Sequence, residues 1–518
     1  MLSAGAPVRR VVRATCAAAL LVAVTAAPGF AEPLAEHRAR LSADLADHLA
    51  AGSQSIDVIV HGDQATVDAL ASRYNVIVKR RLKSGGVLRV NAGQLDALHR
   101  DPDIDHLSGD IPLRPTMAIT NVAIGADQVW AGDGDIPSLT GKGVTVAVID
   151  SGLSDKHSAL RRRVIATMDF TGGDGVDRYG HGTHVAAIIA GQAGRTVEAR
   201  EIQGVAPGAY LVNLRVLGDD GSGVISSVVE AIDWAIEHKD RYRIGVINVS
   251  LGAPVLQSYR DDPMCEAVER AVQAGIVVVA AAGNFGRSAD GRMVFGGVTS
   301  PGNDPYALTV GAIDTQGTPE RSDDTVAAYS SRGPTMYDLV VKPDVVAPGS
   351  HIVSAEAAGS VLAREHPERH VSGFGANAYI QFSGTSMAAG VVSGTVALLI
   401  QSDRHLTPAD AKATIQVSSS FMASAGFLAG GAGSLNALAA ASVVTNGYAK
   451  LPITSIADER IASSGFAALG TSGASDVEGA SIVWGNSIVW GNSIVWGNAV
   501  VWGNSIVWGN SGAAIDAD

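Results

Sequence analysis

Residues 118–445 alternate between near-continuous apolar runs and stretches with helical periodicity. The apolar runs predict strands buried on both faces of a sheet, at residues 144–149, 210–216, 246–249, 276–281 and 307–311. Helices are expected between or after them, at residues 184–190, 226–237, 263–274 and 394–401. This alternation predicts an α/β domain with a doubly wound, mostly parallel sheet. A site in such a fold lies at the carboxyl ends of the strands.

Small residues and an apolar run surround one serine in this domain. Ser386 follows Gly384 and Thr385 and precedes an apolar run that ends at Ile400. The small residues allow a substrate to approach the hydroxyl, and a buried helix would hold it in place. A helix that begins at Ser386 also presents free backbone N–H groups to a developing oxyanion. Alone, the tripeptide is weak evidence, because it is most often an ordinary helix cap.

Three other motifs carry the groups that such a serine needs. Asp150 ends the strand in VAVIDSG, His181 opens a helix between two glycines in GHGTHVA, and Asn284 follows a strand in GNFG. Each has a plainer interpretation: Asp150 could cap a helix, and Asn284 could be a turn residue. His181 and His184 could bind a metal, but no third ligand is suitably spaced, so His184 is better explained as a packed structural histidine.

Together these motifs resemble the subtilases, the subtilisin-like serine peptidases, over residues ~120–445. They follow the order Asp, His, Ser that distinguishes subtilisin from other triad enzymes. Further blocks of the same family occur in the right order, at residues 204–209 (GVAPGA), 216–223 (VLGDDGSG), 248–252 (NVSLG), 329–334 (YSSRGP) and 342–349 (KPDVVAPG).

The resemblance implies a serine endopeptidase that works through an acyl-enzyme. Ser386 would attack the scissile carbonyl, His181 would transfer the proton, Asp150 would orient His181, and Asn284 would donate to the oxyanion. The implied substrate-binding residues are Gly221, Ser222, Gly223, Ile225, Ser250, Leu251, Gly252, Ala281, Ala282, Gly283 and Thr299.

The same resemblance gives a partial account of specificity. Residues 281–283 match the walls of the primary pocket, and Thr299 is aligned with its floor. No acid occurs among them, so strong selection of Arg or Lys is not expected. Ile225 and Leu251 would line an apolar pocket further along. We therefore expect broad endopeptidase action with an apolar preference.

Three features depart from the family pattern. Gly390 stands where the family usually has a proline. The glycine would loosen the start of the helix by ~1 kcal/mol, but its presence removes no chemical group. Residues 192–203 lack the asparagine-rich calcium loop of subtilisin, so structural calcium is permitted but unsupported, and no cofactor is required for the chemistry. An insertion at residues 360–378 has no assigned role.

The N-terminal residues predict two segments before this domain. Residues 1–31 resemble a secretory signal, with Arg9, Arg10 and Arg13 ahead of an apolar run and small residues near Ala31. Residues 32–54 form a linker in which 33–52 could be a short amphipathic helix. Residues 55–117 have the order β-α-β-β-α-β of a ferredoxin-like unit. The family resemblance makes this unit a propeptide inhibitor that is cut off between about 110 and 120; the alternative is an N-terminal structural domain.

Charge and cysteine content limit the remaining classes. The formal net charge of −13, with no basic run to offset it, argues against a nucleic-acid partner. Cys16 would leave with the signal, and Cys265 is expected to be a buried, inert thiol. No segment after the signal has the apolar length expected of a membrane span. These features predict a secreted, extracellular protein whose partners are protein or peptide substrates and its own propeptide.

The C-terminal residues change composition. Residues 446–480 predict an Ala/Ser/Gly-rich linker, residues 481–510 hold five SIVWGN-type hexapeptides, and residues 511–518 form a tail. The even period would place each Trp on the same face of an extended strand, whereas Gly-Asn could instead form a turn in every copy. The repeats predict a β-stacking module that mediates self-association or cell-surface contact. The alternative is a removable extension. A catalytically silent binding scaffold is the alternative function.

Overall fold

The computed structural model forms two compact units, Met1–Leu113 and Arg114–Asp518, and we describe each by itself. The structure describes residues 38–41, 45, 48–49, 53–109, 116–193, 202–449, 451–469, 481–484, 489–490, 494–495, 501–502 and 506–507. The expected signal segment, and most of the expected repeats, lie outside these residues.

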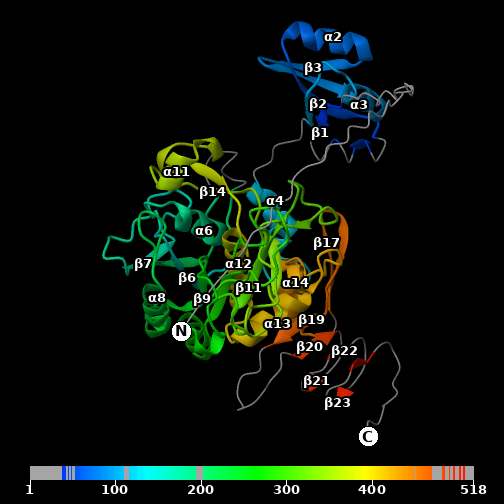
Figure 1. Cartoon of the computed structure of the whole chain (residues 1–518). Helices are drawn as coiled ribbons and strands as arrows, with labels where there is room; N and C mark the ends of the chain where they lie inside the picture. Colours follow the sequence, from blue (N-terminus) through cyan, green and yellow to red (C-terminus); the bar gives the residue numbers. More distant parts are fainter. Residues whose placement is uncertain are drawn as a thin grey trace, which may run out of the picture. The chain divides into compact units, whose positions relative to one another are not determined.

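In its described residues, the N-terminal unit contains a five-stranded sheet and the helices α2 and α3, and Leu45, His48 and Leu49 are also helical (Figure 1). Its elements are β1 (Arg40–Leu41), β2 (Ile56–His61), α2 (Gln64–Tyr74), β3 (Ile77–Leu82), β4 (Gly85–Val90), α3 (Ala92–His99) and β5 (His106–Gly109). The strand order β1-β5-β2-β4-β3 contains the split β-α-β arrangement predicted from the sequence. Asp63 and Asn91 cap the two helices with their side chains. The helix expected over 33–52 is wrong at Arg40–Leu41, which pair in parallel with β5.

The second unit is organised around one large sheet. Its strands are β6 (Thr145–Asp150), β7 (Val164–Asp169), β8 (Tyr210–Arg215), β9 (Ile244–Val249), β10 (Val277–Ala281), β11 (Leu308–Asp314), β12 (Thr325–Val326) and β13 (Val345–Pro348). The order is β12-β11-β10-β9-β6-β8-β7, with β13 beside β11. Every pair is parallel except β11 with β12, which confirms the doubly wound fold.

Helices cover both faces of this sheet because its strands are apolar on both sides. Val146 and Val148 of β6 join the core formed with α6 (His181–Ala190) and α12 (Thr385–Ser402). Ala147 and Ile149 point to the other face and join the core formed with α8 (Ile225–Glu237) and α10 (Pro263–Gln273). The period of two along a strand therefore divides the domain into two cores.

The remaining elements surround these two layers. The helices are α4 (Thr116–Ala123), α5 (Ala126–Ala131), α9 (Lys239–Tyr242), α11 (Val361–Glu365), α13 (Pro408–Ser418), α14 (Phe427–Gly430) and α15 (Ala437–Asn446). The smaller sheets are formed by β14 (Ile352–Ala355), β15 (His370–Ser372) and β16 (Tyr379–Phe382), and by β17 (Ile453–Ile456) and β18 (Glu459–Ala462).

Helix α12 is the central helix of its core. Of the helices in the described ranges, it alone is long and apolar enough to cross a membrane, but 78% of its apolar window is buried inside the domain. It continues without interruption through Gly390. A Cβ at Gly390 would lie 3.2 Å from Cγ2 of Ile188 on α6. The glycine thus allows the helix of Ser386 and the helix of His181 to pack closely.

The described part of the repeats forms short strands. Strands β20 (Ser481–Trp484), β22 (Ile494–Val495) and β24 (Ile506–Val507) pair in parallel, and β21 (Val489–Trp490) pairs in parallel with β23 (Val501–Trp502). Odd-numbered copies of the hexapeptide therefore share one sheet and even-numbered copies share another. β19 (Phe466–Leu469) pairs antiparallel with β20.

Candidate active site

Asp150 lies at the point where the sheet reverses its winding direction. It ends β6, which is flanked by β8 on one side and β9 on the other. This position is the topological switch point, where doubly wound proteins place their sites. The residue is 1% exposed, and its Oδ1 accepts the N–H of Ser151 at 2.7 Å.

His181 is the first residue of α6 and faces this carboxylate. Its Nδ1 lies 2.8 Å from Oδ1 and 2.9 Å from Oδ2 of Asp150. Gly180 caps the helix with a φ of 108°, a conformation that favours glycine. Burial alone would lower the pKa of His181, but the charge of Asp150 and the hydrogen bond outweigh it and raise this pKa above its ordinary value. The pair is therefore built to stabilise an imidazolium.

A second buried carboxylate fixes the start of the same helix. Asp177 accepts the N–H of Gly180 at 2.7 Å and that of Thr183 at 2.8 Å. It also accepts the hydroxyl of Ser151 at 2.9 Å, next to Asp150. Burial raises the pKa of Asp177. The role of Asp177 was not predicted, although an acid four positions before a helix-opening histidine is a recognisable capping signal.

Ser386 is the second residue of α12 and is 9% exposed. Its hydroxyl donates to the carbonyl of Ser250 at 3.0 Å, and the hydroxyl of Ser250 donates to the carbonyl of Ser386 at 3.0 Å. Ser250 in turn accepts from the amide of Asn248 at 2.8 Å, and Asn248 accepts the hydroxyl of Ser393 at 2.9 Å. This buried network joins β9 to the helix that carries the serine. The roles of Asn248 and Ser393 were not predicted.

Asn284 is held so that its amide nitrogen remains available. Its Oδ1 accepts the N–H of Thr385 at 3.0 Å and the hydroxyl of Thr385 at 3.1 Å. The same hydroxyl accepts the N–H of Gly283 at 3.1 Å. The carboxamide is thus anchored to the residue before Ser386. Its Nδ2 lies on the side of Gly384, where an oxyanion donor is required.

The structure brings these groups into one open pocket of about 170 Å³. His181, Asn284 and Ser386 line it together, with Asp150 behind His181. The arrangement contains a nucleophile, a base with its orienting carboxylate, and an oxyanion donor. Such a set is suited to acyl transfer.

The predicted substrate-binding residues include two short segments, 221–223 and 250–252, of which the second contacts the serine through Ser250. The ring of Tyr179 packs against Gly221, whose φ is 77° and where a Cβ would lie 2.4 Å from Cζ of the tyrosine. Ser250 contacts Ser386 as described, and residues 251–252 continue from it. Gly223 and Leu217 form an isolated bridge that closes the first segment. Ile225 starts α8 and is 44% exposed, so it is available to a substrate.

The structure also brings the predicted primary-pocket residues together. A Cβ on Gly252 would lie 2.4 Å from the hydroxyl of Thr299, and a Cβ on Gly283 would lie 2.9 Å from its Cγ2. Thr299 donates its N–H to the carbonyl of Ala282 at 3.1 Å, and Ala281 ends β10 beside it. Thr299 therefore lies close to Gly252 and Gly283 and contributes a neutral side chain, and its role as the floor of the primary pocket stays a prediction.

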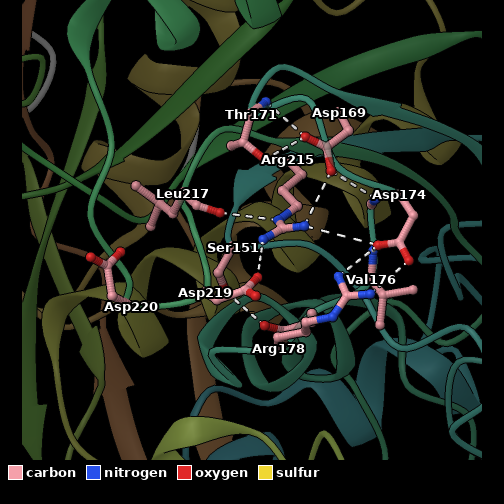
Figure 2. Close-up of polar contacts among 12 residues, drawn as sticks. Ser151, Asp169, Thr171, Asp174, Val176, Arg178, Arg215, Leu217, Asp219 and Asp220 are labelled. Atoms are coloured by element: carbon pink, nitrogen blue, oxygen red, sulfur yellow. Dashed lines mark hydrogen bonds and ion pairs between the residues drawn. The ribbon is translucent and has the colours of Figure 1, made fainter.

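A charged cluster around Arg215 joins the loops that follow β7 and β8 (Figure 2). Arg215 ends β8 with its side chain 3% exposed, and it donates to Asp169 at 3.2 Å and to Asp219 at 2.5 Å. It also donates from Nε to the carbonyl of Leu217 at 3.1 Å. Asp174 forms two bonds of 2.7 Å with Arg178, three residues before His181. The cluster therefore ties the substrate segment to the loop that leads to the base. A lone Arg in an apolar strand was its only sequence signal.

Two other predicted roles can be compared with the structure. His184 is fully buried, and its Nε2 lies 3.1 Å from the carbonyl of Ile352 and 3.2 Å from that of Ile380. Burial lowers the pKa of His184 to about 3, so it is a neutral structural residue, as expected.

Cys265 is buried, and burial raises the pKa of its thiol. Within the described residues, no group of three or more metal-ligating side chains occurs. The expectation about calcium remains untested.

Comparison with known proteins agrees with this geometry. Residues 141–447 match the model of the subtilase family. The chain belongs to this family. It is 37% identical over 271 residues to the serine protease AprX of Bacillus subtilis, a match covering 51% of this chain and 58% of that relative. It is 30% identical over 351 residues to the alkaline protease of Alkalihalobacillus alcalophilus, covering 67% of this chain and 78% of that protein.

One solved structure is also similar to this subtilase. It is a cold-adapted subtilisin-like serine proteinase, 30% identical, which covers 59% of this chain and 92% of its own, with a TM-score of 0.42. The family model and the two relatives confirm the family predicted from the sequence, and the chain is a subtilisin-like member of a family of serine peptidases.

Proposed function

We propose that this subtilase is a secreted serine endopeptidase that hydrolyses peptide bonds through an acyl-enzyme. The observation that carries the proposal is the single pocket in which His181, Ser386 and Asn284 meet, with Asp150 bonded to His181. The alternative of a silent scaffold would require a defect in one of these groups. The described geometry of α12 around Gly390 is regular, so this position supplies no such defect.

The proposed reaction starts with a change of hydrogen bond. The hydroxyl of Ser386 leaves the carbonyl of Ser250 and donates to Nε2 of His181 as substrate enters. Ser386 then attacks the scissile carbonyl carbon while His181 takes its proton, and Asp150 stabilises the imidazolium. The carbonyl oxygen becomes an oxyanion that accepts from Nδ2 of Asn284 and from the N–H of Ser386. Removal of one such donor typically costs about 3–4 kcal/mol in the transition state.

Breakdown of this intermediate completes the cycle. His181 gives its proton to the leaving nitrogen, the C–N bond breaks, and the acyl group remains on Ser386. Water then attacks the ester with His181 as base, the second tetrahedral intermediate expels Ser386, and the acid product leaves. No metal or cofactor participates in these steps.

Substrate selection follows from the pockets on the acyl side. Residues 221–223 and 250–252 offer edges for a substrate strand, which would bind by backbone hydrogen bonds. The floor at Thr299 is neutral, and Ile225 and Leu251 are apolar. These features favour broad cleavage with an apolar preference. They provide no negative charge that would select Arg or Lys before the cleaved bond.

The N-terminal unit is proposed to be a propeptide inhibitor. Its β-α-β-β-α-β order, its compactness as a separate unit and its place before the peptidase domain support this role. The segment between about 110 and 120 would be cut by the enzyme itself. The pattern of residues 1–31 supports export, and the enzyme would act outside the cell.

The repeats are proposed to mediate self-association or cell-surface contact. The alternating parallel pairing of odd and even copies supports a stack whose terminal strand can accept another strand. Deletion of residues 481–518 should then change oligomeric state or surface retention while peptide hydrolysis persists.

The experiment that tests the enzyme proposal compares the chain lacking residues 1–31 with its Ser386→Ala variant. Mass is followed over time, and hydrolysis of a peptide library is measured afterwards. We expect only the wild type to lose its N-terminal unit and to hydrolyse peptides; the variant should lose roughly six orders of magnitude in kcat.

A folded wild type that stays uncut is treated with an active subtilase and assayed again. If the treated protein still hydrolyses no peptide, the alternative of a catalytically silent binding scaffold is supported instead. A requirement for Arg or Lys before the cleaved bond would contradict the expected apolar preference.

A further inference from the structure

The 360–378 insertion supplies one wall of the pocket that contains the triad. Leu362, His366 and Arg369 line it opposite the residues around the nucleophile. They come from α11 and from the short 3-10 helix Pro367–Arg369 that follows it. No role was predicted for this segment, yet its side chains lie in the same pocket as His181 and Ser386.

This pocket lies on the side of the leaving group. None of the substrate segments 221–223 and 250–252 lines it, and neither does Thr299, so it is distinct from the acyl-side pockets. Its other walls are Phe382, Ser383, Gly384 and Met387, which flank the nucleophile. His181 faces the pocket and must deliver its proton to the departing nitrogen. The residues that follow the scissile bond therefore occupy this space.

The wall is fixed at both ends by the catalytic segments themselves. Val361 donates its N–H to the carbonyl of Arg178 at 2.9 Å, and Leu362 donates to Tyr179 at 3.0 Å, just before His181. At the other end, β15 pairs antiparallel with β16, which leads into Ser386. The insertion is thus built into the site rather than attached to a remote loop.

The side chains of the insertion that line the pocket include a positive charge but no negative one. Arg369 is the permanent cation among the lining residues, and no carboxylate lines the pocket. Nε of Arg369 lies 3.7 Å from Oε1 of Glu368, and Nδ1 of His366 lies 3.3 Å from the same oxygen. The side chain of Glu368 is 65% exposed, so this is a weak surface pair that a substrate carboxylate can replace.

We propose that Arg369 selects substrates with a carboxylate on the leaving-group side. The carboxylate belongs to an acidic side chain in the first residues after the scissile bond, or to a free C-terminus at that distance. The shared chemistry is a carboxylate that pairs with a guanidinium. This inference rests on the proposed peptidase function and adds a preference that the acyl-side residues do not supply.

The test uses the processed enzyme and internally quenched peptides that differ at one position. Peptides with Glu, Gln or Lys directly after the cleaved bond carry an amidated C-terminus, and a shorter pair ends there with a free or an amidated terminus. We expect kcat/KM to be about fivefold higher for Glu than for Gln, or for the free terminus than for the amide. The advantage should shrink as salt is raised.

Variants assign the effect to one residue. Arg369→Gln should abolish the preference, and Arg369→Glu should invert it in favour of Lys. Arg364→Gln is the matched control, because Arg364 belongs to the same insertion but donates to the carbonyl of Gly359 and does not line the pocket. It should retain the wild-type preference.

Two results would overturn the inference: no carboxylate advantage in the wild type, or an advantage that survives Arg369→Gln. Cleavage of the Gln peptide by every variant shows that each is folded and active. Failure of the wild type to cleave any peptide would instead refute the peptidase proposal.

Discussion

The two sides of the scissile bond meet walls of different origin. The proposed acyl side consists of residues 221–223, 250–252 and 281–283, which lie at or after the ends of strands β8, β9 and β10 of the central sheet. Its proposed floor, Thr299, is neutral. The leaving-group side is completed by the insertion, with Arg369 and His366. One wall is thus part of the fold, and the other is added to it.

This difference separates two kinds of constraint. Strand ends at the switch point of a parallel sheet are positioned by the packing of two cores, so their residues cannot move independently. The insertion is held at its edges, by backbone hydrogen bonds to residues 178–179, to Ser158 and to Glu356, and by one strand pair with β16. Its exposed side chains can change without disturbing the triad. Changes to the triad should affect all substrates alike, and changes to one wall should affect one side only.

The largest effect is expected from Asp150→Asn, which alters machinery that both sides share. It should lower kcat by about 10⁴-fold for every peptide, because His181 loses the group that orients it and stabilises its charge. The pH profile should change as well. kcat/KM rises with pH as His181 loses its proton, and Asp150 raises the pKa of His181, so the rising limb should lie above the ordinary imidazole value of about 6.5.

Without the charge of Asp150, burial remains and lowers the pKa of His181, so the limb should move to lower pH. Profiles of kcat/KM from pH 5 to 10 measure this shift. Asp155→Asn, which changes an exposed carboxylate nearby, should leave the limb in place. An unchanged limb in Asp150→Asn would mean that another group sets the proton affinity of His181.

Asn284→Ala should have the next largest effect. It removes one oxyanion donor and should lower kcat by about 10²–10³-fold with little change in KM, because the donor acts on the transition state. The loss should be equal for peptides that differ on the acyl side and on the leaving-group side. Steady-state kinetics on both peptide sets measure it. A loss confined to KM would show that Asn284 binds the ground state instead.

Thr299→Asp should change one side only. An acid at the floor of the primary pocket should raise kcat/KM for Arg or Lys before the cleaved bond by about tenfold relative to Leu. The preference at the first position after the bond should stay as in the wild type, since separate sites combine additively. Thr299→Ser is the control, because it changes the same buried side chain without adding a charge. A change in the leaving-group preference of Thr299→Asp would remove the distinction between the two walls.

The sequence predicted the parts of the site that short motifs carry. Asp150, His181, Asn284 and Ser386 each lie at or just beyond one end of a strongly apolar element, so their placement follows from the order of strands and helices. Strand β7 was not predicted, because it alternates between half-buried and exposed residues rather than forming an apolar run. The helix expected over 33–52 failed at Arg40–Leu41, where pairing with β5 replaced local preference.

Contacts between distant segments could not be predicted. Arg215 meets Asp169, which is 46 residues away, only because β7 and β8 are neighbours in the sheet. Asp177 joins Ser151 across 26 residues. Arg369 reaches the pocket because its segment is bonded to residues 178–179. Neither propensity nor periodicity contains such pairings, since they depend on tertiary packing.

The central claim is that Ser386 is an activated nucleophile, and covalent labelling tests it most directly. The processed enzyme is treated with a fluorophosphonate, and the modified residue is located by mass spectrometry of its peptides. The account predicts one adduct, on Ser386, that forms far more slowly in His181→Ala and is absent from Ser386→Ala. A folded, processed chain that takes no label, or takes it on another residue, would contradict the account.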